Sequence, residues 1–238
     1  MSYASTADLL SYSQVKGTDF GFTSDSDSNF TSFLANIIKQ ASTVIDDHCR
    51  VPSGFFAPSG MSFTEIINVN YSLHPGYYLA VPTYYPYPYL LTAQLNNWPV
   101  LSITEIDVNQ AGYGMPDAWS NTPGETDGGA QFPTNYSGWS PKCSVELLFG
   151  RIKFVNAVPA RYYQSVKAQY TAGYASLPQS VNFVCLQLAS SMLQVMLQRK
   201  LSPIVRVGDW AVKFMIPDVF TLEHKRMLAQ YQRSLMSV

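Results

Sequence analysis

Apolar residues recur every three or four positions in several stretches of the chain, the spacing of a helix with one buried face. The clearest case runs over residues 30–49 and should end before Pro52, because proline disfavours helix in the residue that precedes it. Ser5 is placed to cap a short first helix. Two more helices are predicted: 179–199 is apolar on more than one side, whereas 220–235 is apolar on one side and basic elsewhere.

Between about residues 53 and 163 the apolar period changes from helical to two, and glycine, proline and tyrosine become frequent. Alternation of this kind predicts half-buried strands. Strands are predicted at 63–69, 100–108, 151–155 and 166–170, with a short hairpin between 204 and 214. Residues 111–143 are rich in Gly, Pro, Asn and Ser, which predicts a long loop or an irregular lobe.

Together these patterns predict an α+β fold. A core of about four helices is interrupted by a β-rich insertion between the second helix and the long helix of the C-terminal half. The expected parts are an N-terminal helical part at 1–52, an insertion at 53–163, and a C-terminal part at 164–238 with a strand, the long helix, a hairpin and the last helix.

Charge is scarce and unevenly distributed. Charged residues make up 13% of the chain and the formal net charge is −1, so no general attraction to nucleic acid is indicated. No Lys or Arg occurs between Val51 and Pro141, whereas basic residues predominate from Arg199 onward. This asymmetry suits head-to-tail stacking or contact with two different neighbours. Chance in a charge-poor sequence is the alternative.

The chain shows no sign of export or membrane insertion. The N-terminus lacks a basic region followed by an apolar run, so no signal peptide is expected. The apolar stretches are judged too short and too interrupted to span a bilayer. Cys49, Cys143 and Cys185 are odd in number and widely spaced, which indicates reduced thiols in a protein made in a cytoplasm.

No catalytic or metal-binding motif is indicated. The run Asp46–Cys49 holds metal-ligating residue types, but consecutive helical residues point about 100° apart and cannot converge on one ion. The run Asp25–Asn29 copies the start of a calcium loop, which then needs glycine where Phe30 stands, so a helix cap is the better interpretation. We therefore expect no enzymatic activity, no metal and no cofactor. A catalytic triad assembled only in space stays an alternative.

A tyrosine-rich segment is the most unusual local sequence. It contains Tyr84, Tyr85, Tyr87 and Tyr89 with alternating prolines, which keep such a strip extended. Tyrosine offers a large, stiff contact surface with a polar tip, which suits interfaces and sugar stacking. A contact loop within an assembly, a carbohydrate or receptor site, and simple packing over the sheet are all open interpretations.

Four segments, taken in order, resemble the head–tail connector (adaptor) family of tailed phages. They are the helix 30–49 with its Ile-Asp-Asp-His-Cys end, the Pro-Val-Leu-Ser-Ile segment within 98–106, Tyr-Thr-Ala-Gly-Tyr at 170–174 followed by Leu-Pro and a helix, and Val-Gly-Asp-Trp-Ala-Val at 207–212 before the last helix. They cover a little over a third of the chain. The β-rich centre is larger than a minimal connector needs, which suggests an added outer lobe.

The resemblance implies a structural virion protein at the head–tail junction. Such connectors form a ring of about twelve copies beneath the portal protein, seal the packaged head, meet tail or nozzle proteins, and let genomic DNA pass without sequence-specific binding. The chain would be made in the host cytoplasm, without membrane contact. A receptor- or glycan-binding virion module that uses the tyrosine-rich segment is the alternative.

Candidate contact residues follow from this resemblance and from the helix patterns. The ring interface is expected at Val184, Leu188, Met192 and Met196 on the long helix. Portal docking is expected on the last helix, through Phe220, Lys225, Arg226, Leu228, Tyr231 and Arg233. The contact with tail proteins is expected at Tyr84, Tyr85, Tyr87 and Tyr89.

Overall fold

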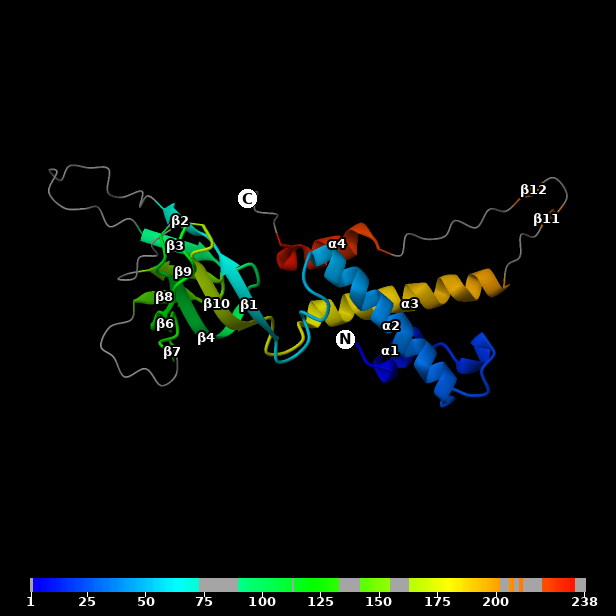
Figure 1. Cartoon of the computed structure of the whole chain (residues 1–238). Helices are drawn as coiled ribbons and strands as arrows, with labels where there is room; N and C mark the ends of the chain where they lie inside the picture. The colour runs from blue at the N-terminus through cyan, green and yellow to red at the C-terminus, as the bar shows by residue number, and fades with distance from the viewer. Residues whose placement is uncertain are drawn as a thin grey trace. The chain divides into compact units, whose positions relative to one another are not determined.

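The computed structural model describes residues 2–72, 90–112, 114–132, 142–154, 163–201, 206–207, 210–211 and 220–233. The chain is a mixed α and β protein, as predicted. It divides into two units: a helical unit, Met1–Pro58 with Ser176–Val238, and a β unit, Ser59–Ala175 (Figure 1). Both ends of the chain therefore build one unit, and the β unit is inserted between them.

The described part of the helical unit contains four α-helices and two short 3-10 helices. They are α1 (Thr6–Ser13), η1 (Gly17–Phe20), α2 (Ser28–Cys49), α3 (Gln179–Leu201), α4 (Leu222–Leu228) and η2 (Ala229–Tyr231). Helix α3 contacts the other three α-helices and is the central element of the unit. All four predicted helices are present, and the last is shorter than predicted within the described residues. Ser5 caps α1 as expected, since its Oγ accepts a hydrogen bond from the backbone nitrogen of Asp8 at 3.1 Å.

Helix α2 shows why its sequence predicts a helix so clearly. The residues at three- and four-residue spacing are buried: Phe30, Leu34, Ile37, Ile38, Ala41 and Ile45. Asp27 caps the start, because its carboxylate accepts from the backbone nitrogen of Asn29 at 2.8 Å. The helix ends at Cys49, and the residue after it, Arg50, has a left-handed φ of 57°, two residues before Pro52. The prediction that a polar residue in 25–29 caps this helix is confirmed.

A buried polar contact fixes the N-terminal segment of the chain. The Tyr3 hydroxyl donates to the carboxylate of Asp46, which also accepts from the backbone nitrogen of Gly54 at 3.0 Å. The backbone nitrogen of Tyr3 donates to Ser42 Oγ at 3.1 Å, and its carbonyl accepts from Asn182 Nδ2 at 2.7 Å. Tyr3 thus joins α2, the turn after α2, and α3.

Burial dominates the protonation equilibria at this contact. Burial raises the pKa of the Asp46 carboxyl, although the donors from Tyr3 and Gly54 lower it in part. Burial, followed by the hydrogen bond to Asp46, holds the pKa of Tyr3 well above its ordinary value. The hydroxyl therefore stays a donor across the working pH range.

Helix α3 is apolar on more than one side, as predicted. One side is buried in the unit and includes Val181, Val184, Cys185, Leu188, Ala189 and Leu193. Phe183 and Met196 are nevertheless 40% and 38% exposed. By length and composition, Gln179–Leu197 could cross a membrane, which corrects the expectation that no apolar stretch is long enough. Within this stretch 44% is buried, and the core helix of a soluble protein meets the same criterion.

The described part of the β unit contains two sheets. The first has the order β1 (Met61–Ile67), β10 (Val166–Ala172), β4 (Val100–Asn109), β5 (Trp119–Asn121). The second has the order β2 (Val69–Ser72), β3 (Leu90–Gln94), β9 (Arg151–Phe154), β8 (Cys143–Glu146), β6 (Gly124–Thr126), β7 (Gln131–Phe132). Alternate residues point inward, as on β10, where Val166, Ala168, Tyr170 and Ala172 are buried.

The boundaries drawn from the sequence differ from those of the two units. Strand β10 was predicted to belong with the C-terminal part, but it pairs with β1 on one side and β4 on the other, so the β unit extends to Ala175. Residues 53–58 belong to the helical unit, where Phe55 and Phe56 are buried. An alternating pattern identifies a strand but not the sheet it joins, and aromatic residues in a turn carry no period at all.

Two smaller elements were predicted less precisely. Residues 111–143 were expected to be a loop or irregular lobe, yet they contain β5, β6 and β7. These strands have two or three residues, too few for a period to show. The hairpin expected near Gly208–Asp209 is present as β11 (Arg206–Val207) paired with β12 (Trp210–Ala211).

The three cysteines are buried free thiols. Burial raises the pKa of Cys49 and of Cys143 to about 12, and that of Cys185 to about 11. All three therefore stay protonated and unreactive in the folded chain. The expectation of unpaired cysteines is confirmed.

Replacing Tyr3 with Phe should destabilise the helical unit by about 1–3 kcal/mol, since it removes a donor from the buried carboxylate of Asp46. The free energy of unfolding is measured by chemical denaturation, followed by the helical circular dichroism signal. Tyr12→Phe is the matched control, because Tyr12 is 43% exposed on the neighbouring helix α1. Equal midpoints for the two variants would contradict the anchoring role of Tyr3.

Candidate interaction surfaces

The C-terminal part of α4 and η2 packs on the helical unit through side chains predicted to dock on a partner. Leu228 is fully buried. The Tyr231 hydroxyl lies 2.8 Å from Ser180 Oγ, and its ring meets Phe56 edge-on at 5.5 Å. The Arg233 guanidinium lies 4.4 Å from the ring centroid of Phe55. Its backbone nitrogen donates to the carbonyl of Cys49 at 3.1 Å.

The start of α4 is held by an aromatic contact with α2. The ring of Phe220 meets His48 edge-on, with centroids 4.9 Å apart, and stacks on His224 at 5.9 Å. The Lys225 ammonium lies 5.8 Å from the same ring centroid. Five of the six predicted docking residues, all except Arg226, therefore have contacts within the helical unit already. Lys225 and Arg226 are exposed on its surface.

The pKa values of two histidines in this contact, His48 and His224, are lowered. Burial lowers the pKa of His48, and the nearby Lys225 and Arg50 cations lower it further. Burial lowers the pKa of His224, opposed by Glu223. Both imidazoles are therefore neutral above their ordinary pKa of about 6.5. The sequence patterns did not predict that His48 on α2 and His224 on α4 contact the same ring.

The predicted ring-interface residues fall into two groups. Val184 and Leu188 are fully buried in the helical unit, which corrects their assignment, because they have no surface left for a partner. Met192 is partly exposed and Met196 is 38% exposed. A helix that is apolar all round does not show in its sequence which side is already covered. The exposed Phe183 meets Tyr12 edge-on at 6.2 Å.

The predicted tail-contact residues Tyr84, Tyr85, Tyr87 and Tyr89 lie outside the described residues. Among those that are described, no group of three or more His, Cys, Asp or Glu side chains could hold a metal ion. The run Asp46–Cys49 diverges: Asp46 faces Tyr3, His48 faces Phe220, and Cys49 is buried. Asp25 accepts from the backbone nitrogen of Gly17 at 2.6 Å.

The hairpin between β8 and β9 presents an apolar tip that the sequence patterns did not reveal. Its turn consists of Leu147, Leu148, Phe149 and Gly150, and the tip is formed by Leu148 and Phe149, which are 62% and 55% exposed. In the sequence, three apolar residues, Leu-Leu-Phe, stand between two strands that are themselves rich in apolar residues. The run therefore contains none of the residue types that usually mark a turn. Only the pairing of Glu146 with Arg151 shows that it is a turn.

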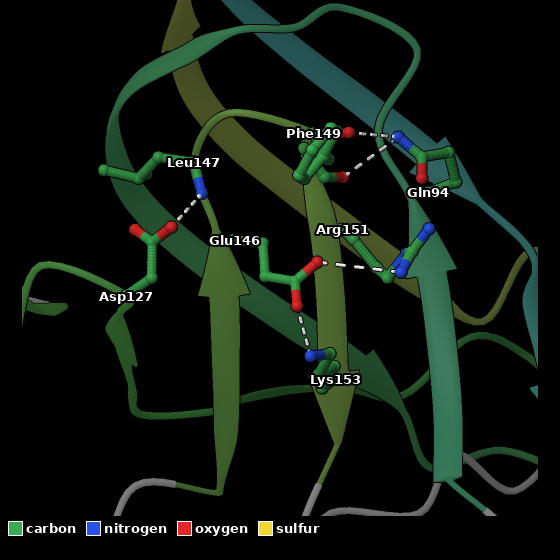
Figure 2. Close-up of polar contacts among 8 residues, drawn as sticks. Gln94, Asp127, Glu146, Leu147, Phe149, Arg151 and Lys153 are labelled. Carbon is green, nitrogen blue, oxygen red and sulfur yellow. Dashed lines mark hydrogen bonds and ion pairs between the residues drawn. The ribbon is translucent and has the colours of Figure 1, made fainter. Parts of the chain in front are cut away.

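The backbone of this turn is held at several points. Gln94 Nε2 donates to the carbonyl of Phe149 at 2.6 Å (Figure 2). The backbone nitrogen of Leu95 donates to the carbonyl of Gly150 at 2.9 Å. The carbonyl of Leu147 accepts from Val100 at 2.8 Å. The backbone nitrogen of Leu147 donates to the carboxylate of Asp127 at 3.3 Å (Figure 2).

Charges next to the tip are balanced. Glu146 lies between Arg151 and Lys153 and forms an ion pair with each (Figure 2). These pairs are partly exposed and contribute little to stability. A well-held turn loses little conformational entropy when its exposed side chains bind a partner.

Comparison with protein-family models and with curated protein sequences gives no match for this chain. The connector resemblance therefore rests on the four sequence segments described above.

Replacing Leu148 and Phe149 together with Ser should change the free energy of unfolding by less than about 0.5 kcal/mol, because exposed side chains contribute little to the folded state. Ile152→Ala on the same hairpin should cost about 2–5 kcal/mol, because Ile152 is fully buried. Chemical denaturation of the β unit measures both. A loss in the Ser variant as large as that in Ile152→Ala would show that the tip is part of the core.

Proposed function

We propose that this protein is a head–tail connector of a tailed virus, which forms a ring beneath the portal, seals the packaged head and joins it to the tail. The observation that carries the proposal is the order of the four connector-like segments. They correspond to α2, β4, β10 leading into α3, and the hairpin β11–β12 before α4. Helices from both chain ends pack together, and the β unit is an insertion in the sequence between them.

A ring uses two different surfaces of each copy, because each subunit meets its neighbours head to tail. On α3 the proposed contact is the partly exposed C-terminal half, at Met192 and Met196. The ring has about twelve copies in this proposal, as is common in such connectors. Portal protein, tail or nozzle proteins and passing DNA are its other partners, at the head–tail junction of the virion.

The charge distribution supports this role. DNA leaves a channel readily when few phosphates are neutralised, because each neutralised phosphate adds affinity. The stretch from Val51 to Pro141 without Lys or Arg suits a channel wall or an outward lobe. The exposed Lys225 and Arg226 suit an acidic portal surface.

Purified protein mixed with the portal protein of its own virus should form rings that cap the portal, visible by negative-stain electron microscopy. Arg226→Glu should weaken capping, because it reverses a charge at the proposed contact. Lys39→Glu is the matched control, since Lys39 is also exposed on a helix. A chain that stays monomeric and ignores the portal would overturn the proposal and favour glycan binding by the tyrosine-rich segment.

Met196→Glu should prevent ring formation while leaving the monomer folded, because a charge is costly at an apolar contact but not at an exposed position. Mass photometry of the protein with portal measures the assembly. Gln194→Glu is the matched control, since Gln194 is exposed on the same helix. Loss of rings in both variants, or in neither, would place the ring contact elsewhere.

A further inference from the structure

Three ionisable groups surround the ring of Phe220 at the start of α4. His48 from α2 meets it edge-on at an interplanar angle of 69°, His224 stacks on it at 26°, and the Lys225 ammonium lies over it. Phe220 is therefore in contact with both imidazoles.

His224 must be neutral for the observed cap of α4. Its Nδ1 accepts a hydrogen bond from the backbone nitrogen of Thr221 at 3.1 Å, while the Thr221 hydroxyl accepts from the backbone nitrogen of His224 at 3.4 Å. A protonated imidazole carries hydrogen on both ring nitrogens and accepts no hydrogen bond. Protonation therefore breaks one half of this reciprocal cap.

Protonation of His48 would leave a buried N–H group without an acceptor among the described residues. Its Nε2 is buried and has no hydrogen-bond partner among the described residues. The cations Arg50 and Lys225 lower its proton affinity further. A charge placed there would be desolvated and repelled.

The remaining charged groups around the contact are few. From α2 they are Asp47, which is exposed, and Asp46, whose carboxylate accepts from Tyr3 and Gly54. From α4 and the residues after it they are Glu223, Arg226 and Arg233. The turn 52–57 and residues 179–197 of α3 contain no charged residue. Glu223 alone raises the proton affinity of His224, and burial outweighs it.

We propose that α4 and η2 form a latch on the helical unit, closed when His48 and His224 are neutral and opened when they are protonated. Opening exposes Phe55 and Phe56 and releases Phe220, Leu228 and Tyr231. The latch stands on contacts within one chain, so it holds whether or not the protein is a connector. If it is, the same side chains become free for the portal.

The direction of the pH effect follows from linkage. Both histidines have a lower pKa with the latch closed than the ordinary value of about 6.5 that they regain when it opens. Below that value the open state binds more protons than the closed state. Closure is therefore fully stable above about pH 6.5 and is progressively lost as the pH falls below it.

Hydrogen exchange measured by mass spectrometry tests the latch in the full chain. Protection of residues 222–231, normalised to the exchange of an unstructured peptide of the same sequence at each pH, should fall on the order of tenfold between pH 8 and pH 5. Protection of 34–45 in α2 should stay constant, which separates opening of the latch from unfolding of the unit.

His48→Phe combined with His224→Gln is the decisive variant. Phe keeps the aromatic contact with Phe220, and Gln at the third helical position can still accept from the backbone nitrogen of Thr221. The variant retains His74, the third histidine of the chain. It should be protected at pH 8 as the original chain is, and should keep that protection at pH 5.

The proposal is overturned if the original chain keeps its protection at pH 5. It is equally overturned if the double variant closes at pH 8 yet loses protection at pH 5 as the original chain does. A double variant that is unprotected even at pH 8 would show that the imidazoles hold the latch by their shape rather than by their charge, and would also reject it.

Discussion

The carboxylate of Asp46 is where separate parts of the helical unit are joined. It accepts from the Tyr3 hydroxyl and from the turn after α2, while the carbonyl of Tyr3 accepts from Asn182 on α3. Burying a carboxylate is costly unless donors surround it. Each donor comes from a different segment, so the carboxylate is satisfied only when all of them have assembled. This makes the central part of the unit cooperative.

The C-terminal segment is held in a different way. Its contacts include a buried leucine, ring contacts at Phe55, Phe56 and Phe220, and hydrogen bonds. These contacts are spread along the segment. Such a segment can open locally while the rest of the unit stays folded. The helical unit thus combines a cooperative core with a separable end.

The fold class and the main helices could be predicted because their periods extend over many residues. Helix α2 and strands β4 and β10 lie within two residues of their predicted bounds. The assignment of β10 failed, because pairing partners are far apart in sequence. The surfaces were less predictable: Val184 and Leu188 have the same apolar character as Met196, and only packing shows which are covered. The tip at Leu148 and Phe149 was missed because three apolar residues in a turn resemble a strand.

The antiparallel pairing of β1 with β10 affects the order in which the chain folds. Met61 pairs with Ala172, so the first and last long strands of the β unit lie side by side. Without this pairing, docking of α3 on α2 would close a loop over residues 50–178. With it, the loop consists only of the connection from α2 to β1 and the connection from β10 to α3. This shorter loop reduces the entropic cost of closure by roughly 2 kcal/mol. The inserted unit therefore acts as a staple for the helices, and synthesis favours this order because α3 emerges after the whole β unit.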